Sequence, residues 1–479
     1  MTLWMVGVAL GAVAVALLLC LGFALLWSEP WESFARSTLA TFALAGLLIW
    51  PARRETGTLN HRSAFVAVSA SWIAACAAGA SPFIGHASVN LGVIDAFFEA
   101  ASGFTTTGAS VISGLDGAPH SLLLWRAMMH LLGGMGIVLL GIAVLPVLGL
   151  GGMQLFRAEA PGPTKDKLTP RIAETAKILW ILYMGLIGVH ALLLWAAGMT
   201  AFDAICHSIG SLSTGGFSTH DASLGHYDSP LILNQISFFM LLGGTNFVIL
   251  HRLLTQGVAW RENTELRAYV AIVLLGVFLV ALDLRLNRPE QFGTSGSATV
   301  HALFQVASII TTTGYASRDF DLWPELSHGV LLMLLMVGGM AGSTAGGPKV
   351  VRVVLSAKFA AAQCFRLIHP RGVLRIKLDN RTVDEDVILG VLGFMAAWGL
   401  IVAFGTFLLA AFGSDVNTAL SATLATFGNV GPGFGEAGPA RVYASFAPQA
   451  KVVMSALMIL GRLEIFTLLV ILAPSFWQD

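Results

Sequence analysis

The chain reads Asp95-Ala-Phe-Phe-Glu-Ala-Ala-Ser-Gly-Phe-Thr-Thr-Thr-Gly108 in its first quarter, an apolar stretch that runs into hydroxyl side chains and a glycine. Three later segments repeat this order of chemistry. They are Phe202-Asp-Ala-Ile-Cys-His-Ser-Ile-Gly-Ser-Leu-Ser-Thr-Gly215, Ala302-Leu-Phe-Gln-Val-Ala-Ser-Ile-Ile-Thr-Thr-Thr-Gly314 and Ala419-Leu-Ser-Ala-Thr-Leu-Ala-Thr-Phe-Gly-Asn-Val-Gly431. Each apolar stretch has about 10–12 residues, which is too short to cross a bilayer but suits a re-entrant half-helix. A pattern that recurs four times predicts four copies of one structural unit.

Each of these segments lies between two long apolar runs. The predicted unit is therefore a spanning helix, a half-helix, a glycine-containing loop and a second spanning helix. Four units give eight spans, and two further apolar runs near residues 4–27 and 37–50 bring the expected number to about ten. The expected fold is an all-α integral membrane protein with four pseudo-symmetric helix–pore loop–helix units around a central pore. The expected boundaries are residues 1–60 for the two amino-terminal helices and 61–155, 156–260, 261–378 and 379–479 for the units.

The composition agrees with a membrane protein. Hydrophobic residues make up 56% of the 479 residues and charged residues 11%, against about 25% charged in a soluble domain. The net charge is zero, so no acidic or basic tail indicates a nucleic-acid partner. The four cysteines are scattered without metal-ligand spacing, which argues against a disulfide framework. The amino terminus has no basic start and its apolar run exceeds about 7–15 residues, so we interpret it as a membrane helix and not as a signal peptide.

Lysine and arginine gather in alternate loops between the predicted spans. Residues 349–381 carry the longest such run, whereas the loops around the four repeated segments hold few basic residues. The positive-inside tendency places the basic loops in the cytoplasm. Both chain termini are then expected in the cytoplasm, and the four repeated segments are expected on the outer side.

The end of each repeated segment suits a dehydrated cation. Non-helical backbone at membrane depth is tolerated only inside protein or beside a water-filled cavity. Glycine adopts positive φ at little steric cost, so Gly108, Gly215, Gly314 and Gly431 can turn successive carbonyl groups to one side. Rings of carbonyl oxygens replace the water around an alkali cation, and each half-helix adds the negative end of its dipole. The predicted selectivity filter comprises Thr106, Thr107, Gly108, Ser213, Thr214, Gly215, Thr312, Thr313, Gly314, Asn429, Val430 and Gly431.

The four loops are not chemically identical. The hydroxyl groups of Thr107, Thr214 and Thr313 add possible oxygen ligands, but residues 429–431 offer no hydroxyl beside their glycine. The expected pore is therefore only pseudo-fourfold. No Asp or Glu lies in the loops, which argues against a high-field site for divalent cations. Potassium is the cation that we expect, while sodium, rubidium and ammonium stay open.

Glycines interrupt the second spanning helix of the third unit. They are Gly338, Gly339, Gly342, Gly346 and Gly347, and Pro348 follows them. A glycine costs about 1 kcal/mol in a helix interior and a proline about 3 kcal/mol, so we expect the helix to break just below the filter. A packing kink or a cytoplasmic turn is the alternative. The stretch is not a nucleotide-binding loop, because proline precedes its lysine and valine follows it.

Arg462 falls near the middle of the last predicted span. A charged residue at that depth is costly and is therefore a candidate functional residue. A cation about 4 Å away would meet repulsion of about 4 kcal/mol at an effective dielectric constant of about 20. The alternative is a buried ion pair, although Glu464 is two residues away and does not face Arg462 on a helix. The predicted gate comprises Gly342, Ser343, Thr344, Gly346, Gly347 and Arg462.

Five further segments have a distinctive sequence. They are Leu132-Gly-Gly-Met-Gly-Ile-Val138, Leu150-Gly-Gly-Met-Gln-Leu-Phe-Arg-Ala-Glu-Ala-Pro-Gly-Pro163, Lys167-Leu-Thr-Pro-Arg-Ile-Ala-Glu-Thr-Ala176, Ala341-Gly-Ser-Thr-Ala-Gly-Gly347 and Gly461-Arg-Leu-Glu-Ile-Phe466. Together with the four loops, they resemble the Trk/Ktr/HKT superfamily of cation transporters, and within it the TrkH-type potassium uptake proteins. The resemblance covers nearly the whole chain, including the two extra amino-terminal helices.

The resemblance implies an assembly as well as a fold. It implies a homodimer in the inner membrane, with one pore in each subunit, and a cytosolic nucleotide-binding partner of the TrkA type. It also implies that the glycine-rich loop of the third unit is a gate in the ion path and that Arg462 faces the pore. No covalently bound cofactor is expected, potassium is the expected substrate, and the expected surroundings are a lipid bilayer without nucleic acid.

Three classes of function compete. The leading hypothesis is gated, passive potassium uptake across the cytoplasmic membrane. The alternative is a proton- or sodium-coupled symporter, although few carboxylates are placed at mid-membrane to carry a coupling proton. A membrane-embedded enzyme is disfavoured, because the sequence has no intramembrane Ser/His dyad or metal-ligand cluster with usable spacing.

Overall fold

A computed structural model describes residues 2–52, 61–139, 168–257, 263–292, 295–370, 375–379 and 381–478. In these ranges the chain is helical apart from turns and one antiparallel hairpin of β1 (Lys377–Leu378) and β2 (Arg381–Thr382). The all-α fold expected from the apolar runs is thereby confirmed. The segment Leu150–Pro163 and the expected boundary at residues 155 and 156 lie outside the described residues.

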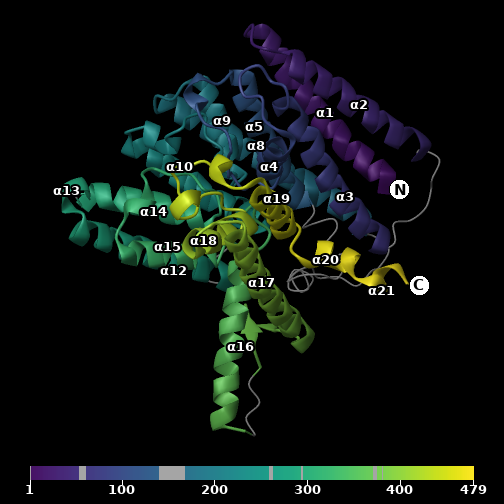
Figure 1. The fold of residues 1–479 in the computed structure, drawn as a ribbon. Helices are drawn as coiled ribbons and strands as arrows, with labels where there is room; N and C mark the ends of the chain where they lie inside the picture. Colours follow the sequence, from purple (N-terminus) through teal and green to yellow (C-terminus); the bar gives the residue numbers. More distant parts are fainter. Residues whose placement is uncertain are drawn as a thin grey trace.

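Two long helices, α1 (Thr2–Leu26) and α2 (Glu32–Ala52), pack side by side at one edge of the molecule (Figure 1). α1 also contacts α3 and α5, so the pair is attached to the first unit. Leu39 and Leu47 of α2 are each 71% exposed. Such large apolar side chains on an outer face suit contact with lipid.

Four units follow, each with a long helix, a half-helix and a second long or broken helix. The first has α3 (His61–Ala80), α4 (Val93–Phe104) and α5 (His120–Leu139). The second has α8 (Leu168–Ala196), α9 (Ala201–Leu212), α10 (Pro230–Gly243) and α11 (Phe247–Gln256). The third has α12 (Thr264–Asn287), α13 (Pro289–Phe292), α14 (Ser295–Ile310), α15 (Glu325–Leu335) and α16 (Val350–Ile368). The fourth has α17 (Glu385–Ala411), α18 (Val416–Phe427), α19 (Pro448–Arg462), α20 (Phe466–Leu472) and the short α21 (Pro474–Trp477).

The half-helices have close to the expected length. α4, α9 and α18 have 12 residues each and α14 has 16. Thr200 caps α9 by accepting a hydrogen bond from the N–H of Asp203, and Asp415 caps α18 by accepting two backbone N–H bonds. In the first turn of α4, Asp95 pairs with Lys451 of α19 at 2.5 Å. Acidic and hydroxyl groups at helix starts offset the unpaired N–H groups and the positive end of the dipole.

The second helices of units two, three and four are all broken. α10 and α11 meet at 106°, and α19 and α20 meet at 114°. α15 and α16 are separated by residues 336–349, which we call the inner loop. The break in unit three was expected and is confirmed, whereas a continuous last span was expected and is wrong. α10 ends at Gly243, and Asn246 caps the start of α11. α19 ends at Arg462, and Glu464 and Ile465, at φ of 55° and 60°, lie between it and α20.

Within the described ranges, six helices are long and apolar enough to cross a membrane, namely α1, α2, α3, α8, α12 and α17. The number rises to eight if α10 with α11 and α19 with α20 each form one span. α5 and the pair α15 and α16 occupy the places of the other two expected spans. The total of about ten spans therefore stays a prediction, as do the unit boundaries.

Glycines on the second helices let the half-helices approach closely. A Cβ on Gly133 of α5 would lie 1.9 Å from the carbonyl oxygen of Phe104, the last residue of α4. A Cβ on Gly461 of α19 would lie 2.0 Å from the carbonyl oxygen of Phe427, the last residue of α18. Only glycine fits where two backbones touch. These contacts fix the carboxyl ends of the half-helices near the centre of the protein.

Candidate ion pathway

The four repeated segments end in one shared backbone turn. Its first residue has φ of 53° in Thr106, 53° in Thr214, 56° in Thr312 and 55° in Asn429. Its third residue has φ of 84° in Gly108, 82° in Gly216, 82° in Gly314 and 96° in Gly431. In all four turns the residue between donates its N–H to the carbonyl five residues earlier, at 2.8 Å. Non-glycine residues at positive φ cost about 1–3 kcal/mol each and persist where the surroundings impose them, which is common at functional sites.

The second turn is one residue out of register with the sequence prediction. Gly215 was expected to take positive φ, but Gly216 does so instead. The predicted trio of Ser213, Thr214 and Gly215 is therefore corrected to Thr214, Gly215 and Gly216, and Ser213 is the C-cap of α9. The reason is the pair of adjacent glycines. Only the second glycine occupies the position that requires left-handed backbone.

The four turns close a ring. In every turn, a Cβ added to the positive-φ glycine would collide with a carbonyl oxygen of the next turn. The distances are 2.3 Å for Gly108 and the oxygen of Gly215, 1.9 Å for Gly216 and Thr313, 1.9 Å for Gly314 and Val430, and 2.5 Å for Gly431 and Thr107. The fourth turn thus returns to the first. Four separate stretches of chain therefore contact one another in a closed cycle, and their symmetry about a central pore stays a prediction.

The carbonyl oxygens at these contacts have no hydrogen-bond donor among the residues that the structure describes. Those of Thr107, Gly215, Thr313 and Val430 accept no hydrogen bond from any residue that the structure describes. All four residues are buried, and about 90% or more of buried carbonyl groups in proteins are hydrogen-bonded. The same group is unpaired at the same position of four turns. A cation on the axis is the partner that such a ring of oxygens can share.

Hydroxyl side chains distinguish alternate turns. Thr105 Oγ1 and Thr107 Oγ1 are 2.7 Å apart in the first turn, and Thr311 Oγ1 and Thr313 Oγ1 are 2.7 Å apart in the third. The second and fourth turns have glycine and valine at the position of the second threonine, so neither can form this bond. In the fourth turn, Asn429 donates from Nδ2 to Thr107 Oγ1 at 3.1 Å. All four turns therefore share one backbone conformation, but only the first and third have a hydroxyl pair.

A cavity, which we call the vestibule, opens on the side of the ring where the chain leaves the turns. Its lining includes Gly108, Gly216, Gly314 and Pro432, one from each turn or directly after it. The residues that follow the first, second and fourth turns form much of its wall, including Arg441. Solvent therefore reaches the ring from this side.

Glu99 and Arg126 form a buried ion pair in the wall of the vestibule. Arg126 Nε lies 2.9 Å from Glu99 Oε1, with the two side chains 2% and 0% exposed. Arg126 also donates to the carbonyl oxygen of Ser218, and Glu99 accepts the N–H of Val111. The pair thus joins the segments after the first and second turns. Sequence reasoning missed both residues, although a carboxylate inside an apolar half-helix is itself a signal.

The inner loop contacts the ring from the side of the half-helices. The N–H of Gly346 donates to Thr312 Oγ1 at 2.7 Å. Thr344 Oγ1 donates to the carbonyl oxygen of Leu212, the last residue of α9, at 2.9 Å. A Cβ on Gly346 would lie 2.3 Å from the carbonyl oxygen of Gly428 in the fourth unit. The loop therefore touches the base of the second, third and fourth turns together.

Arg462 fastens the inner loop to the first unit. Its Nη1 donates to the carbonyl oxygen of Thr344 at 2.8 Å and its Nη2 donates to that of Gly133 at 3.0 Å. The side chain is 2% exposed. Among the described residues no carboxylate forms an ion pair with it, and Glu464 pairs instead with Arg352 of α16 at 2.5 Å. Arg462 thus bridges the fourth unit, the loop and the first unit.

The other predicted gate residues also lie in the inner loop. Gly342 and Gly347 have φ of 74° and 72°, and Ser343 closes a local turn by donating to the carbonyl oxygen of Met340. Two residues that sequence reasoning missed hold this loop. They are Asn246, whose Nδ2 donates to the carbonyl of Ala341 at 2.7 Å, and Glu265, whose Oε1 accepts the N–H of Ala341 at 2.7 Å.

A family model described as a cation transport protein, TrkH, matches residues 31–269 and 291–479. These ranges contain all four turns, the inner loop and Arg462. The chain belongs to the TrkH family of cation transport proteins.

Relatives of this TrkH-family chain are similar over nearly their whole length. The chain is 44% identical to the Trk system potassium uptake protein TrkH of Salmonella typhimurium over 453 residues, which cover 94% of the chain and 92% of the relative. It is 41% identical to the protein of that name in Vibrio parahaemolyticus over 481 residues, covering 99% and 98%. The crystal structure of the potassium transporter TrkH from Vibrio parahaemolyticus matches with a TM-score of 0.91 and 38% identity, covering 99% of both chains. The resemblance and the fold class are both confirmed.

Proposed function

We propose that this chain takes up potassium across the cytoplasmic membrane as the translocating subunit of a Trk-type system. The relatives named above are potassium uptake proteins by name. The observation that carries the proposal is the ring of four unpaired carbonyl oxygens, one from each turn. Carbonyl oxygens suit a dehydrated alkali cation, whereas a divalent site takes carboxylate ligands that these turns lack.

The cation sheds water in the vestibule and takes carbonyl oxygens in its place. The proposed coordinating residues are Thr106, Thr107, Gly108, Thr214, Gly215, Gly216, Thr312, Thr313, Gly314, Asn429, Val430 and Gly431. The half-helices α4, α9, α14 and α18 end at these turns, and each carboxyl end carries about half a negative charge. Four such ends lower the energy of a cation at the centre of the ring.

Potassium uptake by cells that lack their own potassium transporters tests the filter. We expect the wild-type chain to restore growth at low potassium, and Gly108→Ser and Gly314→Ser to lose preference for potassium over sodium. Gly114→Ser is the matched control, because Gly114 has φ of 75° but no atom within 4 Å of an added Cβ. A purified wild-type protein that passes no cation in liposomes would overturn the proposal.

The inner loop is the proposed gate. It lies against the base of three turns, and Arg462 holds it to the first unit, so a cation that leaves the ring meets this loop. Gly346→Ala places a methyl group against Gly428 and is expected to displace the loop and change the open probability. Single-channel recording in bilayers measures this directly. Flux and open probability equal to those of the wild type would reject a gating role.

Arg462 adds an electrostatic barrier to the closed loop. A unit charge about 4 Å from a cation raises its energy by about 4 kcal/mol at an effective dielectric constant of about 20. We expect Arg462→Ala to raise cation flux and Arg462→Lys to leave it closer to the wild type. The thermal unfolding midpoint is measured alongside, because Arg462→Ala also removes the hydrogen bonds to the carbonyl oxygens of Thr344 and Gly133.

Potassium flux in liposomes separates a passive pathway from a coupled symporter. A passive pathway responds to the membrane potential alone, while a symporter requires its proton or sodium gradient. We expect rubidium tracer uptake to follow an imposed potential at equal pH and without sodium on either side. Uptake that appears only with a proton or sodium gradient would favour the symporter.

The proposed assembly follows the resemblance. It is a homodimer in the inner membrane with both termini in the cytoplasm, together with a TrkA-type nucleotide-binding partner. Figure 1 shows α16 and α17 projecting from the body of the protein, and the far end of α16 carries Leu367 and Ile368, which are 84% and 72% exposed. We place the partner there. Leu367→Asp is expected to weaken co-purification with such a partner while leaving the dimer intact.

A further inference from the structure

Three metal-ligating side chains meet at the rim of the vestibule. Asp116 lies in the short turn η2 (Leu115–Gly117), which follows the first turn of the ring. His220 follows the second turn and lines the vestibule, and His226 ends the turn η4 (Ser223–His226). One ligand atom from each side chain lies within 4.8 Å of those of the other two. The group joins the first unit to the second and is separate from the carbonyl ring.

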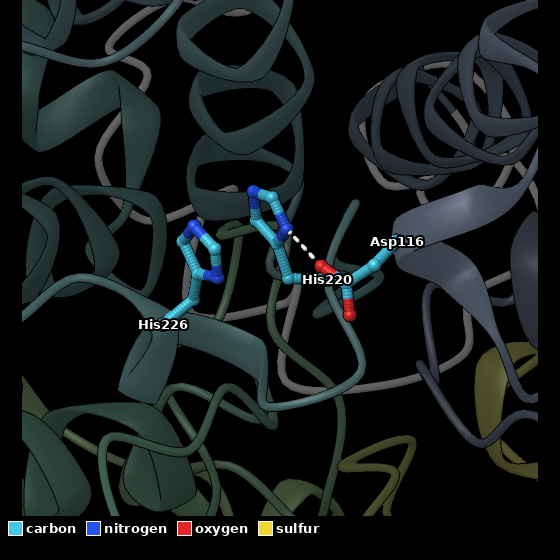
Figure 2. A group of neighbouring side chains, drawn as sticks. All are labelled: Asp116, His220 and His226. Atoms are coloured by element: carbon cyan, nitrogen blue, oxygen red, sulfur yellow. Dashed lines mark hydrogen bonds and ion pairs between the residues drawn. The ribbon is translucent and has the colours of Figure 1, made fainter.

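His220 is the centre of this group (Figure 2). Its Nδ1 lies 2.6 Å from Asp116 Oδ1, and its ring stacks on that of His226 with centroids 3.6 Å apart and planes 3° apart. The side chain of His226 forms no hydrogen bond with any residue in the described ranges. His226 is therefore available to bind a ligand, and it lies beside His220 and the carboxylate of Asp116.

The other nitrogen of His220 is already oriented. Its Nε2 lies 3.2 Å from Tyr227 Oη and 3.6 Å from Asp203 Oδ2. Asp203 is itself held by the hydroxyl groups of Thr200 and Thr219, both at 2.7 Å. Metal-binding histidines almost always have such a partner on the second nitrogen, which fixes the tautomer and the ring orientation. This arrangement leaves Nδ1 of His220 as the ligand atom.

The two loops are fixed before a ligand arrives. The N–H of Gly114 donates to Asp221 Oδ1 at 2.9 Å, and the N–H of Asp221 donates to Asp116 Oδ2 at 3.3 Å. Hydrogen bonds from backbone N–H groups to the carboxylates of Asp116 and Asp221 therefore join the two segments that carry the three ligands.

We propose that Asp116, His220 and His226 bind a late first-row divalent cation such as Zn²⁺ at the rim of the vestibule. Two imidazole nitrogens and one carboxylate oxygen are a common ligand set for zinc, with metal–ligand distances of about 2.0–2.2 Å and water in the fourth position. Tetrahedral ligands at that distance are about 3.4 Å apart. The observed separations, from 2.6 Å to at most 4.8 Å, bracket this value.

Isothermal titration of the full-length, tag-free, metal-free protein in detergent with ZnCl₂ tests this site. We expect one high-affinity Zn²⁺ for each chain, no comparable binding of Mg²⁺, and loss of that binding in the double variant His220→Ala with His226→Ala. Mg²⁺ is the informative comparison because it prefers oxygen ligands in octahedral geometry. His120→Ala is the matched control, since His120 pairs with Glu29 at 3.2 Å in the same way but has no second histidine in its group.

Gentler variants keep the test decisive if the double variant folds poorly. Asp116→Asn is expected to weaken Zn²⁺ binding, and Asp116→His is expected to keep it, because imidazole replaces the carboxylate ligand. Tyr227→Phe removes the hydroxyl group beside Nε2 of His220 and leaves Asp203 near that nitrogen. It is expected to weaken binding by about 10-fold. Zn²⁺ binding that is equal in the wild type and in all variants, or absent from the wild type, would overturn the proposal.

Discussion

The first and third turns of the ring differ from the second and fourth in side chains and not in backbone. Thr105 and Thr107 share a hydroxyl bond of 2.7 Å, as do Thr311 and Thr313. The other two turns lack this pair, yet all four have the same two positive-φ positions and the same 2.8 Å backbone bond. The comparison indicates that the backbone contacts between turns define the ring. The hydroxyl pairs stiffen two of its four sides.

The largest expected effect comes from a methyl group at the contact between turns. Gly216→Ala and Gly314→Ala each place a Cβ 1.9 Å from the carbonyl oxygen of the next turn. We expect potassium uptake to fall by more than about 10-fold, because 1.4 kcal/mol of lost cation stabilisation already corresponds to a factor of ten. The measurement is rubidium uptake for equal amounts of protein in the membrane. Wild-type uptake by Gly216→Ala would show that the second turn does not share the backbone role of the third.

Gly114→Ala is the control for strain at positive φ. Gly114 has φ of 75°, close to the value in the ring, but an added Cβ meets open space. We expect uptake near the wild-type level. A loss as large as that of Gly216→Ala would assign the effect to local backbone strain and not to contact between turns.

A second prediction tests the corrected register of the second turn. A Cβ on Gly215 would lie 2.3 Å from Nδ1 of His130, a buried side chain stacked on Phe217. Gly215→Ala is therefore expected to impair uptake by a clash with a side chain, whereas Gly216→Ala clashes with backbone. Adding His130→Ala is expected to restore uptake to Gly215→Ala and not to Gly216→Ala. Equal rescue of both would contradict the register.

The smallest expected effect comes from removing one hydroxyl group. Thr313→Val removes one hydrogen bond, because Thr311 Oγ1 still donates to the carbonyl oxygen of Ala307 at 2.6 Å. The loss of one such bond costs about 0.5–1.5 kcal/mol. Thr107→Val removes in addition the acceptor of Asn429 Nδ2 and is expected to lower the unfolding midpoint further. Selectivity is expected to change less than in the glycine variants. A selectivity loss equal to theirs would give the hydroxyl pairs, and not the backbone, the leading role.

The four repeats in the sequence predict the fold, because an apolar stretch of about 10–12 residues is too short to cross the bilayer and suits a re-entrant half-helix between two spanning helices. It also predicts the break in the third unit, where five glycines and a proline make a continuous helix costly. The breaks beside Asn246 and at Ile465 were not predicted. The first lies at a pair of glycines, Gly243 and Gly244, followed by the cap Asn246, and the second lies at two residues other than glycine. Both local patterns are shorter than the run of glycines in the third unit.

The register of the second turn shows why sites are harder to predict than folds. Residues 213–215 match the composition of the other filters, but positive φ belongs to the residue that touches Thr313, and that residue is Gly216. The contact lies between segments about a hundred residues apart, so no local pattern reports it. The same holds for Glu99 and Arg126, whose pairing depends on the packing of α4 against α5.

The inner loop ends at Lys349 and the chain continues directly as α16. A helix of 19 residues is about 28 Å long, and its first turn is held at Arg352, whose guanidinium pairs with Glu464 and lies 3.9 Å from the centre of the Phe394 ring. α16 is therefore a rigid helix held near its amino-terminal end, at Arg352. Because Ile368 lies much farther from Arg352 than the inner loop does, a sideways displacement of Ile368 moves the inner loop by a smaller distance. A partner that bends α16 can therefore work against the hydrogen bonds of Thr344 and Gly346 without touching the ring.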